Sequence, residues 1–168
     1  MARETIPFSP RTGLPVVAVV IGWSQAERDE FKRIGLALPD ATDAAPTDAL
    51  VDTGAHRSFI PEDYVERLGL APIGEGIVQQ SLGGAIVVPF YAARIEIITR
   101  SGLTWQRHGL APTIQVGVIP SNHGAARVLP MPIVGRDVLA TCVFRYDGPA
   151  RTLEFDSAPK RPRRKPKA

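Results

Sequence analysis

Short apolar segments, separated by residues that favour turns, make up most of this chain. Residues 14–22 are apolar and rich in valine, and a segment of that length and composition predicts a buried β-strand. Ser24 and Glu27 then form a capping-box pattern, which predicts a short helix that ends at Pro39. The apolar face of that helix would come from Phe31, Ile34, Leu36 and Leu38.

The segments that follow repeat this strand-rich pattern. Residues 49–51 predict a short strand, and Pro61 followed by acidic residues predicts the start of a second helix. Residues 76–98 predict two strands joined by a tight turn at Gly83-Gly84, because glycine adopts the φ angles that such turns need. Further strand candidates are residues 104–108, 113–119 and 143–155, the last interrupted by a turn at Asp147-Gly148. We therefore expect a mostly β protein with one or two short helices.

Length and composition fit a single globular domain. The chain has 168 residues, of which 44% are hydrophobic and 22% charged, so it can bury a core of its own. Its longest apolar run, residues 16–22, is far shorter than the roughly 20 residues of a membrane span, and no basic-then-apolar leader precedes it. We therefore expect a cytoplasmic protein without membrane contact. Cys142 is the single cysteine, and its apolar neighbours predict interior packing.

Positive charge is concentrated at the C-terminal end. Six of the 20 basic residues lie in residues 160–168, whereas all 17 acidic residues precede them, so residues 1–159 carry a net charge of −3. Proline and like charge without apolar residues predict a disordered basic tail over residues 157–168. We expect this tail to keep the protein in solution, or to make a weak contact with a polyanion through residues 160–168. We expect residues 1–13 to form an N-terminal lead-in that is ordered only by a partner strand. Residues 14–156 are expected to form the folded domain.

Asp52 is the first candidate for chemistry. It follows apolar residues 49–51 and precedes Thr53 and Gly54, so a hydrophobic strand delivers a carboxylate to its end. Burying an ionised carboxylate is costly unless something compensates it, which makes such an aspartate a candidate functional group. From the residues alone, an exposed aspartate in an Asx-turn is an equally good interpretation.

A second segment repeats this arrangement 83 positions later. Residues 132–134 are apolar and lead into Gly135, which is followed by the charged pair Arg136-Asp137. The pair opens an apparent short helix. Both segments thus consist of an apolar strand, a glycine and charged or polar residues at the end of the strand.

Taken together and in this order, three segments resemble the retropepsin-like aspartic proteases, the single-domain family of retroviral and retrotransposon proteases with bacterial and cellular relatives. Residues 52–55 (DTGA) are similar to the catalytic signature of that family, and residues 133–137 (IVGRD) to its second motif. Between them, residues 81–85 (SLGGA) resemble the tip of the flap that closes over substrate. The resemblance covers much of residues 14–155.

This resemblance implies an all-β, closed or partly open barrel with a flap hairpin, acting as a symmetric homodimer. It implies an aspartic endopeptidase in which two Asp52 carboxylates, one per subunit, activate a water without cofactor or metal. The implied site residues are Asp52, Thr53 and Gly54 for catalysis, Ala55, His56, Ser81, Leu82, Gly83 and Gly84 for substrate binding, and Gly135, Arg136 and Asp137 as a structural second motif. The implied partners are a peptide or protein substrate and a second copy of the chain.

Two features depart from the family pattern. His56 stands where relatives usually carry a small, acidic or amide residue, so the resemblance implies no ion pair between this position and Arg136. Residues 24–46 are longer than the corresponding connection in compact viral enzymes. A function of another class also stays open, namely a catalytically silent dimer that keeps the protease fold to bind peptides or a partner protein.

Other chemistry has less support in the sequence. The three histidines and Cys142 lack the spacing of compact zinc motifs. The chain contains no P-loop, no dinucleotide glycine pattern and no Gly-x-Ser-x-Gly elbow. We therefore expect neither a metal nor a nucleotide cofactor.

Overall fold

The computed structural model describes residues 3–39, 42–79, 84–101, 104–119 and 131–156, and strands dominate them. The strands are β1 (Arg3–Pro7), β2 (Val16–Trp23), β3 (Thr47–Val51), β4 (Phe59–Pro61), β5 (Pro72–Gln79), β6 (Ala85–Ser101), β7 (Thr104–Ile119), β8 (Ile133–Val134), β9 (Val143–Asp147) and β10 (Thr152–Asp156). The helices are α1 (Gln25–Arg33), α2 (Glu62–Leu68) and α4 (Arg136–Leu139). The predicted all-β class with short helices is confirmed.

Six of the described strands close into a barrel. In the larger sheet the strands follow the order β2-β3-β8-β4-β7-β6-β5, and a further pairing between β2 and β6 closes the ring. β5 lies outside the ring and extends the sheet by pairing with β6. This closure confirms the barrel that the sequence predicts, and it leaves the β5–β6 hairpin as an extension of it.

Alternating side chains fill the barrel. In β2, Val17, Val19 and Ile21 are almost fully buried, as the two-residue period of a strand requires when one face meets the core. The same core cluster includes Ala49, Val51, Ile60, Ile95, Ile97, Val116, Val118 and Val134 from other strands of the ring. The valine-rich segment at residues 14–22 is therefore a buried strand, as predicted.

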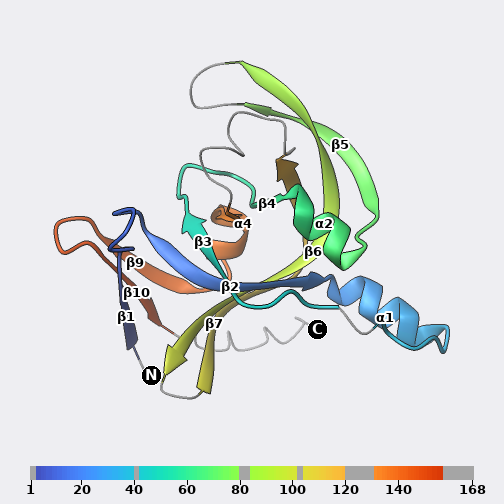
Figure 1. Cartoon of the computed structure of the whole chain (residues 1–168), viewed down its shortest axis with the longest axis horizontal. Coiled ribbons are helices and arrows are strands. Elements are labelled where there is room, and N and C mark those ends of the chain that lie inside the picture. The colour runs from blue at the N-terminus through green and yellow to red at the C-terminus, as the bar shows by residue number, and fades with distance from the viewer. Residues whose placement is uncertain (1–2, 40–41, 80–83, 102–103, 120–130, 157–168) are drawn as a thin grey trace, which may run out of the picture.

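β6 serves both the barrel and the hairpin. Its first residues pair with β5, from Ala85 opposite Gln79 to Tyr91 opposite Pro72, whereas residues 93–98 pair with β2. Figure 1 shows β5 and the neighbouring part of β6 as a curved arm that rises from the barrel. The two strands predicted around Gly83-Gly84 are confirmed. Residues 80–83 lie outside the described residues, and Gly84 has a φ of +87°, which favours glycine.

Both longer helices begin as the sequence predicts. The Ser24 side chain accepts a hydrogen bond from the Glu27 N–H, and the Glu27 carboxylate accepts one from the Ser24 N–H, so the capping box is present at α1. Pro61 precedes α2, whose first turn contains two acidic residues that suit the positive end of a helix.

The end of α1 differs from the prediction. The helix stops at Arg33 rather than at Pro39, because the chain turns at Gly35, which has a φ of +73°. α1 contributes no fully buried residue, and Ile34 and Leu36 are about half exposed. The predicted apolar face was therefore wrong for these two residues, although Phe31 packs edge-on against Trp23.

The strand boundaries also required one correction. Residues 104–119 form the single strand β7 rather than separate strands at 104–108 and 113–119. β7 stays continuous because its pairing with β6 shifts register twice, near Ile95 and near Ile98. The turn predicted at Asp147-Gly148 does separate β9 from β10.

A smaller sheet lies beside the barrel, in the order β1-β10-β9. β1 pairs antiparallel with β10 over its whole length, so the partner strand predicted for the N-terminal segment belongs to the same chain. Figure 1 shows this sheet and α1 on opposite sides of the molecule. The predicted basic tail, residues 157–168, lies outside the described residues. Among the residues described, no helix is both long and apolar enough to cross a membrane.

Candidate active site

Parallel pairing of β3 and β8 brings the two predicted motifs together. Leu50 pairs with Ile133 and Val51 with Val134. The Asp52 N–H continues this ladder by donating to the Val134 carbonyl at 3.0 Å. Asp52 therefore leaves β3 directly beside the glycine that follows β8, although the two segments are far apart in the sequence.

Local hydrogen bonds fix the Asp52 carboxylate. Its Oδ1 accepts from the Gly54 N–H at 2.8 Å and from the Ala55 N–H at 3.2 Å. A Cβ added at Gly54 would lie 3.1 Å from that oxygen, a close contact that the carboxylate would have to relieve by a small shift. Asp52 is half-buried and Thr53 is exposed. Asp52 thus forms the Asx-turn, and the same residue also lines a pocket.

Ser58 connects the two motifs, and the sequence did not predict this role. Ser58 is fully buried, and its Oγ donates to Asp137 Oδ1 at 2.6 Å while it accepts from the Gly135 N–H at 2.9 Å. The Ser58 N–H donates to Asp137 Oδ2 at 2.9 Å. Asp137 thus holds the segment after Asp52 against α4. A small polar residue directly before the apolar residues 59–60 was the available signal.

Gly135 and Arg136 complete this connection through the backbone. A Cβ at Gly135 would lie 2.5 Å from the Arg57 carbonyl oxygen, so only glycine permits the two segments to approach. The Arg136 N–H donates to the Ala55 carbonyl at 3.0 Å. The second motif therefore fixes the loop that carries Asp52.

His56 and Arg136 make the contact that the sequence left open. Arg136 Nη2 lies 3.0 Å from His56 Nδ1. A guanidinium only donates hydrogen bonds, so Nδ1 is the acceptor and the proton of the neutral imidazole sits on Nε2. Histidine is thus the partner of Arg136, and the pair carries a net positive charge.

A pocket of about 670 Å³ opens beside Asp52. The described residues that line it are Asp52, Gly54, Ala55, His56, Arg57, Phe59, Ile77, Val78, Gln79 and Ile133. The lining joins the loop after β3 to one strand of the β5–β6 hairpin. It therefore lies between the candidate carboxylate and the arm that Figure 1 shows above the barrel.

The predicted site residues divide into three groups. Those that line the pocket are Asp52, Gly54, Ala55 and His56. Those that support its loop or lie next to it are Thr53, Gly135, Arg136 and Asp137. Ser81, Leu82 and Gly83 lie outside the described residues, and Gly84 at the start of the returning strand is exposed.

Sequence reasoning missed much of the pocket wall. Ile77 and Gln79 lie two residues apart on β5, so they share a face of the strand. The two-residue period of the strand that precedes the predicted glycine turn was the signal for this shared face. Arg57 also lines the pocket, and its position next to His56 was the signal for it. No such local signal marks Phe59, whose place in the pocket depends on the pairing of β4 with β8.

Cys142 is not among the described residues that line this pocket. Cys142 is partly buried, its Sγ donates to the Leu139 carbonyl, and burial raises the pKa of the thiol to about 11. The predicted interior packing of Cys142 agrees with this environment. Among the described residues, no group of three or more histidine, cysteine, aspartate or glutamate side chains could hold a metal ion.

Comparison with known proteins identifies the family. The sequence model of the family described as "Aspartyl protease" matches residues 41–138, which include Asp52 and the second motif. The chain belongs to this aspartyl protease family, as the three ordered segments had indicated. A solved structure of a retropepsin-like aspartic protease from Rickettsia conorii matches with 15% sequence identity and a TM-score of 0.47, over 92% of this chain and 90% of that chain. No curated protein matches this chain in sequence.

Proposed function

We propose that the protein is an aspartic endopeptidase in which two copies of the chain each supply one Asp52 to a shared active site. The observation that carries this proposal is the position of Asp52, which leaves a buried strand, is held by two backbone N–H groups and lines a pocket of about 670 Å³. Membership of the aspartyl protease family supports the same reaction class.

The number of carboxylates supports a dimer. Asp52 is the only carboxylate among the described residues that line the pocket. Aspartic protease chemistry needs two, and the chain contains one Asp-Thr-Gly sequence. A two-fold axis beside Asp52 would supply the second carboxylate from an identical subunit. Thr53, which is exposed in the single chain, would then be free to form hydrogen bonds across that axis.

The mechanism follows from two neighbouring carboxyl groups. Like charges repel at short range, so the two Asp52 groups share one proton. The ionised member accepts a proton from a water as the water attacks the peptide carbonyl, and the protonated member donates to the carbonyl oxygen. Gly54 leaves space for the substrate backbone beside them. No cofactor is needed for this proton transfer.

The β5–β6 hairpin would act as the flap. Ile77 and Gln79 of β5 line the pocket opposite the Asp52 loop, and Ile77 is 73% exposed. An extended peptide between the hairpin and the loop would cover this apolar side chain and exclude water from the reacting groups. Ser81, Leu82, Gly83 and Gly84 would form the tip that contacts the substrate.

Peptide-library cleavage tests this proposal. The protein and its Asp52→Asn variant are each incubated with a diverse peptide library between about pH 4 and pH 8, and the products are identified by mass spectrometry. Cleavage by the unmodified protein and a loss of at least about a thousandfold in the variant are expected. The variant retains the side-chain shape, so its urea unfolding curve and its oligomeric state should match those of the unmodified protein.

The opposite result has a definite meaning. If a folded dimer cleaves no peptide, or if Asp52→Asn cleaves equally well, the enzyme proposal is wrong. The function that then remains is the catalytically silent dimer that binds peptides or a partner protein. Loss of the dimer in the variant would instead assign Asp52 a structural role.

A further inference from the structure

One wall of the pocket carries positive charge. Arg57 and His56 line it, and Arg136 contacts His56 from behind. Both arginines are exposed. The charged groups on or next to this wall are the guanidinium groups of Arg57 and Arg136 and the carboxylate of Asp52.

Arg57 is held in place by neutral groups. Its Nη1 donates to the Gln115 Oε1 at 2.7 Å, and its guanidinium lies 4.8 Å from the centre of the Phe90 ring. These contacts orient the side chain without neutralising it. Within the described part of the chain, no carboxylate forms an ion pair with Arg57 or Arg136.

The carboxylate of Asp137 is already occupied by other hydrogen bonds. Asp137 lines a smaller cavity of about 230 Å³ together with His56, Arg57 and Gln115. Its two oxygens accept from the Ser58 N–H, the Ser58 hydroxyl and the Val138 N–H. The carboxylate of Asp137 therefore accepts its hydrogen bonds from within the protein. The guanidinium of Arg57 keeps N–H donors that are available to a ligand.

We propose that Arg57, supported by the His56–Arg136 pair, forms a cationic subsite that selects peptides with an aspartate or glutamate close to the bond to be cleaved. The inference rests on the proposed function, because it assigns a substrate class to the same pocket. A guanidinium recognises a carboxylate with two parallel hydrogen bonds, which an uncharged amide of the same shape cannot match. The Nε2–H of neutral His56 supplies a further donor on this wall.

Peptide capture separates the acidic preference from catalysis. The Asp52→Asn protein is immobilised and exposed to a library of acetylated, amidated peptides in which each Asp and Glu has an Asn or Gln counterpart. We expect acidic peptides to be retained about tenfold better than their amide counterparts, and this preference to weaken as salt is added. Adding Arg57→Gln should abolish the preference, and Arg57→Lys should retain part of it because lysine keeps the charge without the planar fork.

Arg33→Gln is the matched control for the loss of one arginine. Arg33 lies on α1, outside the pocket, and pairs with Glu30, so its variant should keep the acidic preference. Urea unfolding of each variant checks that the fold is intact. The subsite proposal is overturned if acidic and amide peptides are retained equally, or if Arg57→Gln leaves the preference unchanged.

Cleavage of the same library by the protein with Asp52 intact distinguishes the two proposals. An Arg57-dependent acidic preference without Asp52-dependent cleavage would contradict the proposed enzyme and leave the cationic subsite standing. Cleavage that depends on Asp52 but occurs equally at acidic and amide peptides would support the proposed enzyme and contradict the cationic subsite.

Discussion

Ser58 shows how much a single side chain contributes to this site. One hydroxyl and one N–H connect the loop after Asp52 to Asp137, and the same hydroxyl accepts from the Gly135 N–H. Ser58 itself is fully buried, so a group that loses its hydrogen bond to Ser58 has little water to replace it. The position of the catalytic candidate therefore depends on a residue that does not itself face the pocket.

Replacing Ser58 with alanine should destabilise the protein strongly. Ser58→Ala removes both bonds of the hydroxyl and leaves the Gly135 N–H and one Asp137 oxygen short of a partner. We expect the free energy of unfolding to fall by about 3 kcal/mol in urea titration. Ser24→Ala is the matched comparison, because Ser24 is equally buried but its hydroxyl bonds only Glu27 at the start of α1, and its loss should cost about 1 kcal/mol. Equal losses in the two variants would show that Ser58 does not connect the motifs.

At the residue scale, the sequence predicted the motifs but not the pocket wall. Asp52 and Gly135 stand at the ends of apolar segments, so both could be found from local pattern. Arg57 and Gln115 approach each other only because β4 pairs with β7. Contacts of this kind depend on long-range strand pairing, which a single sequence does not reveal.

At the scale of elements, the central part of β6 is buried on both faces. Ile95 and Ile97 face the barrel core, whereas Arg94 and Glu96 are 9% and 3% exposed on the other face. Alternation of apolar and polar residues therefore marks β6 as a strand but misleads about which residues are buried. A network of charges covers the second face, and Asp43 belongs to it.

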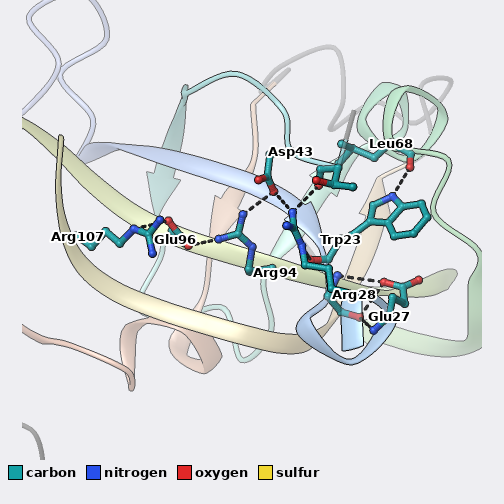
Figure 2. A network of polar contacts seen from close by, with 10 residues as sticks. Trp23, Glu27, Arg28, Asp43, Leu68, Arg94, Glu96 and Arg107 are labelled. Carbon is teal, nitrogen blue, oxygen red and sulfur yellow. Dashed lines mark hydrogen bonds and ion pairs between the residues drawn. The ribbon is translucent and has the colours of Figure 1, made fainter. Parts of the chain in front are cut away.

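The network joins residues 24–46 to the barrel. Asp43 lies between Arg28, at 2.6 Å, and Arg94, at 2.5 Å, as Figure 2 shows. Arg94 also pairs with Glu96, which in turn pairs with Arg107 at 3.0 Å. The long connection after β2 is thus fixed by charges that alternate in sign. Sequence patterns predicted its helix start but not this attachment, because the partners lie on different strands.

Removing the buried charge of Glu96 tests the network. In Glu96→Gln, Arg94 stays almost buried but loses its carboxylate partner on β6, and breaking a buried pair in this way costs about 3 kcal/mol. The measurement is the free energy of unfolding in urea. Glu30→Gln, which breaks an exposed pair with Arg33, is the control and should change stability little. A loss no greater than that of the control would mean that the network does not stabilise the fold.

At the scale of the whole molecule, the sequence predicts more about the fold than about the assembly of subunits. Apolar segments and glycine turns were enough to indicate a β-rich domain, and β2–β6 pairing closes it into a barrel. The proposed dimer rests on a different argument, namely that the proposed reaction needs two carboxylates and the chain contains one Asp-Thr-Gly sequence. Strand patterns carry no information on that point, so a functional measurement has to supply it.

The most direct measurement mixes active and inactive subunits. The unmodified chain and Asp52→Asn are unfolded together, refolded in known ratios, and assayed on a peptide that the unmodified protein cleaves. If each active site needs Asp52 from both subunits, activity per total protein follows the square of the unmodified fraction, so an equal mixture retains about one quarter of full activity. A decline in simple proportion, with about one half retained, would contradict the shared site.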